Sequence, residues 1–298
     1  MTGVLSYITW NVSPFIYEGE HFAIGWYGTL WTLGLLGMLI TLLVTFKHDG
    51  VPSQFALITF MVSLVCVIFF GHLFQGLFYE WYYSPDDPGY YLGIDWDYRN
   101  WYFDHPWKFL DFAHGGFASH GMILGVLLTG CIMEEIIRCS KWWVIDRAVM
   151  GFFILAICVR LGNFFNAEIY GIPTTLSLGV LFPDDQQPSH PTQFYELISY
   201  AIPLVFVWWL YAKREGGAYK GLITSFIVFF AVVSRFLIEF LKTPQMQIES
   251  GWTLNMGQWL SIPYIVFSLW LLIRALRDGK QTDIGPSQGL TPPKKRKR

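Results

Sequence analysis

Charge and cysteine are both scarce in this sequence. Only 14% of its 298 residues are charged, whereas 53% are hydrophobic and 19% are aromatic. A balance this apolar is typical of membrane proteins and argues against a water-soluble chain. The cysteines lack the paired spacing of a disulfide framework or a zinc site, so burial in or beside apolar segments explains them best. They are Cys66, Cys131, Cys139 and Cys158.

Several motifs are also missing, and each absence excludes a class of membrane protein. The Gly-x-Ser-x-Gly motif of a serine nucleophile and the zinc-binding His-Glu-x-x-His are absent, which argues against intramembrane serine proteases and zinc proteases. The last apolar segment has no lysine for a retinal Schiff base. Residues 1–22 have neither a basic region nor a small-residue cleavage site, so we expect the first apolar segment itself to insert.

Long apolar segments dominate what remains. Segments of about 17 to 23 apolar residues are long enough to cross a bilayer as helices. The sequence therefore predicts an all-α, polytopic membrane protein with about seven transmembrane helices. We place these spans at Ile24–Phe46, Phe55–Phe78, Phe117–Ile137, Ala148–Phe165, Phe194–Ala212, Leu222–Leu241 and Gln258–Ile273.

Basic residues in the connecting segments predict the orientation. Lysine and arginine flanking short loops stay on the cytoplasmic side, which places the N-terminus outside and the C-terminus inside. We expect one membrane domain over residues 1–280, with a folded extracytoplasmic loop at 80–113, and a disordered basic tail at 281–298. The tail favours contact with anionic lipid over nucleic acid. The basic residues used are Lys47, Arg138, Lys141, Arg147, Lys213, Arg214, Lys220, Arg274, Arg277, Lys280 and those of 294–298.

Two arginines lie inside the predicted spans at similar depth. With a rise of about 1.5 Å per residue, Arg160 lies roughly 8 Å and Arg235 roughly 9 Å below the outer ends of their helices. Glu239 follows Arg235 by one helical turn and can neutralise or orient it. Buried charges of this kind mark functional sites in membrane proteins, although a single arginine near a helix end commonly extends to water instead.

Other polar side chains reach the same level. Tyr27, His120, His190 and Glu196 begin three other spans, while Asn163 and Asn166 share a helix with Arg160. Taken singly, Tyr27 would suit a membrane interface and His120 a packed core. The two asparagines would suit interhelical hydrogen bonds. Their shared depth favours one site in the outer leaflet.

Two guanidinium groups at headgroup depth are suited to binding a phosphate. Arginine binds phosphate oxygens through paired, charge-assisted hydrogen bonds, which strengthen in a low dielectric. A phospholipid is therefore the expected ligand, with no metal and no cofactor. The alternative is an anion or lipid transporter with an intramembrane Arg/Glu site, but such sites lie near the midplane between repeats, and no repeat stands out here.

Six blocks of the sequence resemble one known family, the bacterial phosphatidylglycerol:prolipoprotein diacylglyceryl transferases. The most specific block runs from Arg160 to Gly171 and includes Asn163 and Glu168. The others occur in the expected order along the whole chain. They are Trp26-Tyr27-Gly28, the segment 115–121 ending in His120-Gly121, the segment 190–196 from His190 to Glu196, Arg235 with Glu239, and Met256-Gly257-Gln258.

The resemblance implies a bacterial inner-membrane enzyme whose active site faces the periplasm. It would move the diacylglyceryl group of phosphatidylglycerol to the lipobox cysteine thiol of a prolipoprotein signal peptide, releasing glycerol 1-phosphate. Arg160 and Arg235 would hold the lipid phosphate, and His120 and Tyr27 would be essential. Asn163, Glu168, Gly171 and Glu239 would complete the site, with Asn166, His190 and Glu196 as further binding residues.

The base that removes the thiol proton stays open at this stage. A free thiol, with a pKa near 8.5, is a poor nucleophile, so a nearby base would help. His120 is the best-placed candidate, Glu239 and Glu196 are weaker ones, and the arginines alone would also favour the thiolate. The chain departs from the family pattern at Met122, at His114 and in the length of its first outer loop, which concerns the entrance to the site.

Overall fold

The computed structural model describes residues 7–82, 99–112, 116–183, 185–213, 219–243, 249 and 251–280. The predicted tail at 281–298 and the parts 83–98 and 113 of the predicted outer loop lie outside these residues. The same holds for Arg214 and His114.

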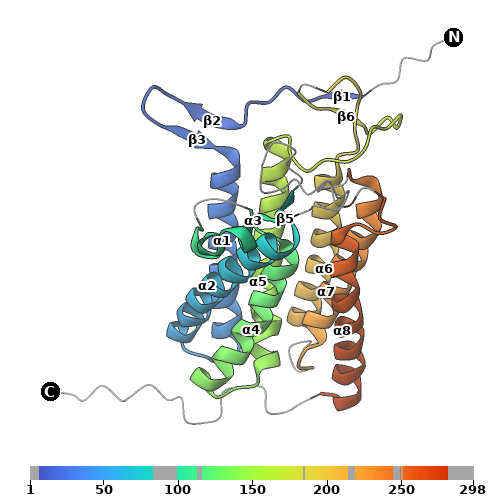
Figure 1. The fold of residues 1–298 in the computed structure, drawn as a ribbon. Helices are drawn as coiled ribbons and strands as arrows, with labels where there is room; N and C mark the ends of the chain where they lie inside the picture. Colours follow the sequence, from blue (N-terminus) through green and yellow to red (C-terminus); the bar gives the residue numbers. More distant parts are fainter. Residues whose placement is uncertain are drawn as a thin grey trace.

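Seven long helices form the body of the protein, as predicted (Figure 1). By length and composition, each of these seven in the described part of the chain can cross a membrane. Five agree with the predicted spans to within a few residues, the fourth begins before its predicted start, and the last continues beyond its predicted end. The helices are α1 (Trp26–His48), α2 (Ser53–Phe78), α4 (Ser119–Ile137), α5 (Lys141–Phe165), α6 (Thr192–Lys213), α7 (Leu222–Ile238, continued by a 3₁₀ turn at Glu239–Leu241) and α8 (Met256–Asp278).

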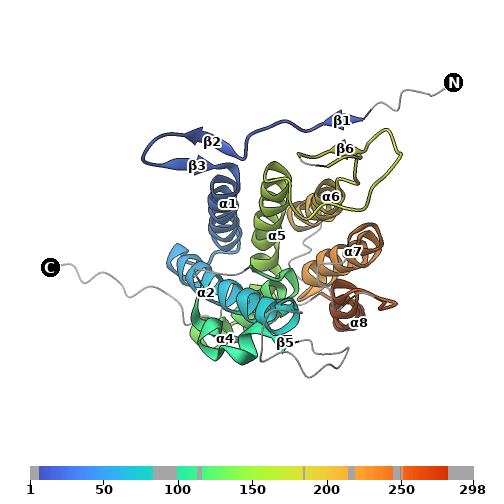
Figure 2. The same cartoon turned by 45° about the horizontal axis from the view of Figure 1, so that its top comes forward.

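Helix α5 occupies the centre of the bundle and packs against α1, α4, α6 and α7 (Figure 2). Its contact with α1 depends on small residues, because a Cβ on Gly34 would lie 2.8 Å from Leu155 and one on Gly37 would lie 2.6 Å from Ile154. Both glycines therefore allow α1 to approach α5 closely. Gly28 of the same helix has no such role, because a Cβ there would meet nothing within 4 Å.

The start of α5 differs from the prediction. The helix begins at Lys141 and not at Ala148, so Lys141 and Arg147, which we had assigned to a loop, are helical. Polar partners on other helices make this possible. Asp146 accepts hydrogen bonds from the backbone N–H groups of Gly221 and Thr224 at 2.8 and 2.9 Å and thereby caps α7. Charged residues near a helix end were misassigned because these partners are distant in sequence.

Short strands and turns lie outside the long helices. They collect mainly at the end of the bundle where α1 begins (Figure 1). One pair is parallel, β1 with β6, and two are antiparallel, β2 with β3 and β4 with β5. The bounds are β1 (Ile8–Thr9), β2 (Phe15–Glu18), β3 (Ala23–Gly25), β4 (Trp81–Tyr82), β5 (Arg99–Asn100), α3 (Trp101–Asp104), a 3₁₀ turn at Pro106–Leu110 and β6 (Val180–Leu181).

Residues 99–112, a described part of the loop between α2 and α4, pack against α2. Tyr102 is buried against Gly76 of α2, where a Cβ would lie 2.7 Å from its ring. The imidazole Nε2 of His72 lies 2.9 Å from the carbonyl oxygen of Lys108. Residues 99–112 therefore pack on α2.

All four cysteines are free thiols. Cys66 and Cys139 are buried and Cys158 is half-buried, in agreement with the prediction. Cys131 contradicts it, because this side chain is exposed on α4. A weakly polar thiol on an apolar helix face costs little in lipid, so its exposure is tolerated.

Candidate active site

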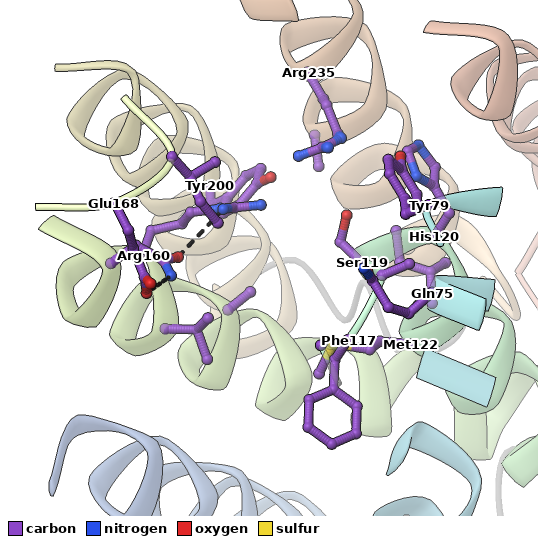
Figure 3. A pocket seen from close by; sticks show the side chains of 18 of the residues that line it. Gln75, Tyr79, Phe117, Ser119, His120, Met122, Arg160, Glu168, Tyr200 and Arg235 are labelled. Carbon is purple, nitrogen blue, oxygen red and sulfur yellow. Dashed lines mark hydrogen bonds between the residues drawn. The ribbon is translucent and has the colours of Figure 1, made fainter. Parts of the chain in front are cut away.

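A cavity of about 430 Å³ lies among the long helices towards the end that carries β1–β3. Six predicted site residues line it, and they come from α1, α4, α5, α7 and the turn after α5. In Figure 3, Arg160 lies on the left of the cavity, Arg235 above it, and His120 with Tyr79 on the right. The six are Tyr27, His120, Arg160, Asn163, Glu168 and Arg235.

One part of the cavity wall is apolar. It is formed by side chains from α4, α5 and α7, including Met122, Phe152, Phe153, Ala156 and Val232. The cavity therefore has a charged part and an apolar part, which resembles the boundary between a lipid headgroup and its acyl chains.

The two arginines converge on one carboxylate, that of Glu196 on α6. Arg160 Nε lies 2.6 Å from Glu196 Oε2, and Arg235 Nη1 lies 3.0 Å from Oε1. Each oxygen of Glu196 thus holds one guanidinium, which fixes the distance and orientation between the two. The expectation that the arginines meet at one depth agrees with this geometry. Glu196 itself lies behind them and is not among the lining residues.

A third cation shares this carboxylate. Lys242 Nζ lies 2.7 Å from Glu196 Oε1, and the Lys242 side chain is only 1% exposed. Glu239 is more distant from the cations, at 3.7 Å from Arg235 Nη2 and 3.9 Å from Lys242 Nζ. Three buried cations therefore surround two carboxylates, and Arg235 Nε finds no hydrogen-bond partner among the described residues. The cluster is prepared for an additional anion.

The other side of Arg160 contacts a short polar chain. Its Nη1 donates to Asn163 Oδ1 at 3.3 Å, and Asn163 Nδ2 donates to Glu168 Oε1 at 2.7 Å. Asn163 is one helical turn after Arg160, and Glu168 follows the end of α5, so local sequence alone brings them together. The chain fixes the amide orientation of Asn163 and holds the guanidinium between Glu168 and Glu196.

His120 is the first-turn residue of α4 and is buried. Its Nε2 lies 3.0 Å from Ser261 Oγ, and Ser261 Oγ donates its proton to the carbonyl oxygen of Gly257 at 2.6 Å. Because that hydroxyl proton is engaged, the serine accepts a proton from Nε2. His120 Nδ1 then carries a lone pair, and it has no partner among the described residues.

Two glycines near the site permit close packing. A Cβ on Gly162 would lie 2.9 Å from the ring of Tyr27, so Gly162 lets this tyrosine approach α5. A Cβ on Gly171 would overlap the carbonyl oxygen of Leu241. Gly171 also pairs with Lys242 through a backbone bridge. Gly171 therefore positions the segment that carries Lys242.

Five predicted site residues are not among the cavity lining. Asn166 ends α5 as its C-cap, and His190 contacts Tyr195, with 3.2 Å between His190 Nδ1 and the phenol oxygen. Gly171, Glu196 and Glu239 lie in the wall behind the lining residues, with the contacts given above. Among the described residues, no three His, Cys, Asp or Glu side chains are grouped to hold a metal ion.

Sequence reasoning missed Lys242, Tyr79 and Tyr200, which also line the cavity. Lys242 carried a usable signal, because it is a lysine at the predicted outer end of a span, where lysine is uncommon, three residues after Glu239. Burial lowers the pKa of Lys242 to about 8, although Glu196 opposes the shift. Burial raises the pKa of Tyr79 to about 12, so its hydroxyl keeps its proton. Neither tyrosine had a distinguishing pattern in this aromatic-rich chain.

Comparisons with known proteins identify the family of this chain. The family profile described as prolipoprotein diacylglyceryl transferase matches residues 14–274. Proteins named phosphatidylglycerol–prolipoprotein diacylglyceryl transferase from Chloroherpeton thalassium and Porphyromonas gingivalis are each 33% identical to the chain. The alignments cover 92% of this chain and 97% and 96% of the two relatives. A protein of the same name from Chlamydia caviae is 32% identical over 93% of the chain. The chain therefore belongs to the prolipoprotein diacylglyceryl transferase family.

Proposed function

We propose that this protein transfers the diacylglyceryl group of phosphatidylglycerol to the lipobox cysteine thiol of a prolipoprotein and releases glycerol 1-phosphate. The observation that carries this proposal is the pair of guanidinium groups fixed by Glu196 at the wall of a half-apolar cavity. Family membership supports transfer over the alternative of anion or lipid transport.

The dimensions of the cavity favour a lipid headgroup. At about 430 Å³ it lies near the lower end of the range of about 300–1,000 Å³ typical of small-ligand pockets. A phosphoglycerol group fits such a volume, whereas two acyl chains do not. The chains would leave past the apolar wall and lie among the surrounding lipid, while the phosphate contacts Arg160 and Arg235.

The proposed reaction is a displacement at carbon. The cysteine sulfur attacks the diacylglyceryl carbon bonded to the phosphate oxygen, the carbon–oxygen bond breaks, and its electron pair stays on that oxygen. Negative charge therefore grows on the phosphate. Arg160 and Arg235 are fixed before the reaction, so they stabilise this charge without reorganising.

His120 supplies the proton acceptor in this mechanism. Its Nδ1 is the unprotonated nitrogen, because Nε2 donates to Ser261, and it has no partner among the described residues. The thiol proton would move to Nδ1 as sulfur attacks. Glu196 and Glu239 are poorer candidates for the base, since both carboxylates already contact cations.

The remaining predicted residues would position these groups. Asn163 and Glu168 orient Arg160, and Tyr27 closes the wall over Gly162. We place the cavity in the outer half of a bacterial inner membrane. The basic ends of α1, α4, α5, α6 and α8 would then face the cytoplasm. Phosphatidylglycerol, the prolipoprotein signal peptide and membrane lipids are the proposed partners, with no role for nucleic acid.

The direct test is incubation of the purified protein with phosphatidylglycerol and a peptide containing a lipobox cysteine, followed by mass measurement of the peptide. We expect a mass increase equal to one diacylglyceryl group. Mild hydrolysis of the esters should remove the two acyl chains and leave the glyceryl group on the peptide, because the thioether bond resists hydrolysis. A peptide with serine in place of the cysteine is the matched control and should stay unmodified. An unchanged cysteine peptide, with folded protein and lipid present, would refute the proposal.

A further inference from the structure

Lys242 lies directly after the last turn of α7, and its side chain is part of the cavity lining. The 3₁₀ turn at Glu239–Leu241 ends the helix and changes the chain direction at this residue. The backbone N–H of Ile172 donates to the carbonyl oxygen of Leu241 at 2.8 Å, and Gly171 forms a backbone bridge with Lys242. Lys242 is thus held from two sides, unlike a mobile surface lysine.

The charges around Lys242 do not account for its burial. Its ammonium shares Glu196 Oε1 with Arg235, while Arg160 occupies Oε2. Glu239 lies at 3.9 Å. A buried ammonium is costly unless it is fully paired, so a lysine that only shares a carboxylate is a poor structural element. Its position suits a group that gains a partner during the reaction.

The reaction changes the charge of the phosphate. Phosphatidylglycerol is a phosphodiester with one negative charge, whereas the leaving glycerol 1-phosphate is a monoester whose second pKa is about 6 and which is therefore mostly a dianion at neutral pH. The second charge appears as the carbon–oxygen bond breaks. Arg160, Arg235 and Lys242 directly contact the carboxylates of Glu196 and Glu239, so these five groups carry one net positive charge, and Lys242 supplies it. Without Lys242 the cluster would have no net charge to balance the second charge of the monoester.

We propose that Lys242 Nζ binds the leaving glycerol phosphate and stabilises the charge that develops as the carbon–oxygen bond breaks. This inference rests on the proposed function and assigns one further residue to it. Glu196 Oε1 remains paired with Arg235 when the ammonium turns to the phosphate oxygen. Lys242 would contribute more to the transition state and the product than to the bound lipid.

The environment of Lys242 makes its proposed role dependent on pH. Burial, with a contribution from Arg235 and Arg160, lowers its pKa to about 8, although Glu196 and Glu239 act in the opposite direction. The protonated form is the one that stabilises an anion. In the free enzyme this form is present below about pH 8 and is lost as the pH rises above it.

The experiment compares Lys242→Met with Lys242→Arg. For Lys242→Met we expect kcat to fall about 100-fold, as for loss of one donor to a developing anion. KM for phosphatidylglycerol should change less than about threefold, because the interaction forms late. Inhibition by glycerol 1-phosphate should weaken by at least about tenfold. Lys108→Met is the matched control, because Lys108 pairs with Asp111 at 3.0 Å outside the cavity and should leave all three values unchanged.

Lys242→Arg keeps the charge at every pH that the assay can reach. We expect its kcat/KM, divided by that of the unmodified protein, to rise about tenfold between pH 7 and pH 9, as the lysine alone loses its proton. Dividing the two cancels the titration of the substrate thiol. This measurement remains decisive even if Lys242→Met fails to fold.

A folded Lys242→Met protein with normal kcat and normal inhibition by glycerol 1-phosphate would overturn the inference. The inference would also fail if kcat/KM of Lys242→Arg, divided by kcat/KM of the unmodified protein, did not change with pH. A larger effect on KM than on kcat would also overturn it, because Lys242 would then bind the lipid and not the leaving group. The proposed function would survive all three results, since it fails only if the unmodified protein transfers no lipid to the peptide.

Discussion

Helix α5 carries two buried arginines, one near each end, and their surroundings differ. Arg147 places Nε and Nη2 at 2.8 and 2.6 Å from Asp49 Oδ2 and donates from Nη1 to the carbonyl oxygen of Trp143 at 2.9 Å. The other Asp49 oxygen accepts the hydroxyl proton of Tyr211 at 2.8 Å. Arg160, by contrast, shares its carboxylate with two further cations and lines a cavity.

The comparison shows that a buried arginine alone does not identify a reaction site in a membrane protein. Around Arg147 one guanidinium meets one carboxylate, and the rings of Trp143 and Tyr211 lie 4.3 and 5.5 Å from its central carbon. The cluster is satisfied and holds α1, α5 and α6 together. Around Arg160, three cations share the two carboxylates of Glu196 and Glu239, and the cavity lies beside them. The unpaired positive charge beside a cavity is the feature that points to an anionic substrate.

The largest effect is expected at the cavity arginines. Arg160→Ala and Arg235→Ala should each reduce transfer of radiolabelled lipid to the peptide by about 10³-fold, because each removes a fixed donor to the developing phosphate charge. Thermal unfolding in detergent should show that both variants remain folded. Near-normal transfer by either variant would mean that this arginine is not needed for the reaction. The difference proposed between the cavity arginines and Arg147 would then be wrong.

Arg147→Met should act on stability. Removing one partner of a buried ion pair leaves Asp49 uncompensated, at a cost of about 3–5 kcal/mol. We expect a lower midpoint of thermal unfolding, with normal transfer by the molecules that are folded at low temperature. The double variant Arg147→Met with Asp49→Leu should recover part of the loss. A stable Arg147→Met protein without activity would mean that this cluster also takes part in the reaction.

Gly171→Ala tests whether wall residues act through position. The added methyl would overlap the Leu241 carbonyl oxygen and displace the backbone beside Lys242. A shift of about 1 Å at a catalytic group costs up to about 100-fold, so we expect transfer to fall by about 10- to 100-fold. At Gly25 a Cβ would meet only the carbonyl oxygen of Pro14, at 3.8 Å, so Gly25→Ala is the control. Equal activity of the two variants would contradict this role of Gly171.

The smallest effect is expected at Asp146, the second polar residue of the satisfied end. Its carboxylate accepts from the backbone of Gly221 and from both the backbone and the hydroxyl of Thr224. Asp146→Asn keeps one acceptor oxygen and should lower the free energy of unfolding by about 1 kcal/mol, as for other helix caps. Transfer activity should be unchanged. A large loss of activity at constant stability would show that the two ends of the bundle are coupled.

The sequence predicted the helices well because lipid imposes a simple rule on them. Any apolar run of sufficient length becomes a span, since its backbone polar groups must pair within the helix. The rule did not predict the start of α5, because Asp146 and Arg147 are charged and their partners, Thr224 and Asp49, are distant in sequence. It did not predict the short strands either, since they lie outside the long apolar runs.

The site was predictable in part. Helical rise placed Arg160 and Arg235 at one depth, and spacing joined Arg160 to Asn163. Depth does not give the direction of a side chain around the helix axis. It therefore could not show that Glu196 holds the arginines from behind, or that Asn166 and His190 lie away from the cavity lining. The tautomer of His120 depends on Ser261, 141 residues away in the chain.

The positions of the cysteines have a consequence for an enzyme that alkylates thiols. Cys158 lies on α5 only two residues before Arg160, yet its Cβ packs against Gly34 of α1, and none of the four cysteines lines the cavity. The protein's own thiols are thereby kept away from its reactive lipid. A cysteine introduced at Ser119, which does line the cavity, would lack this protection and become a target for self-modification.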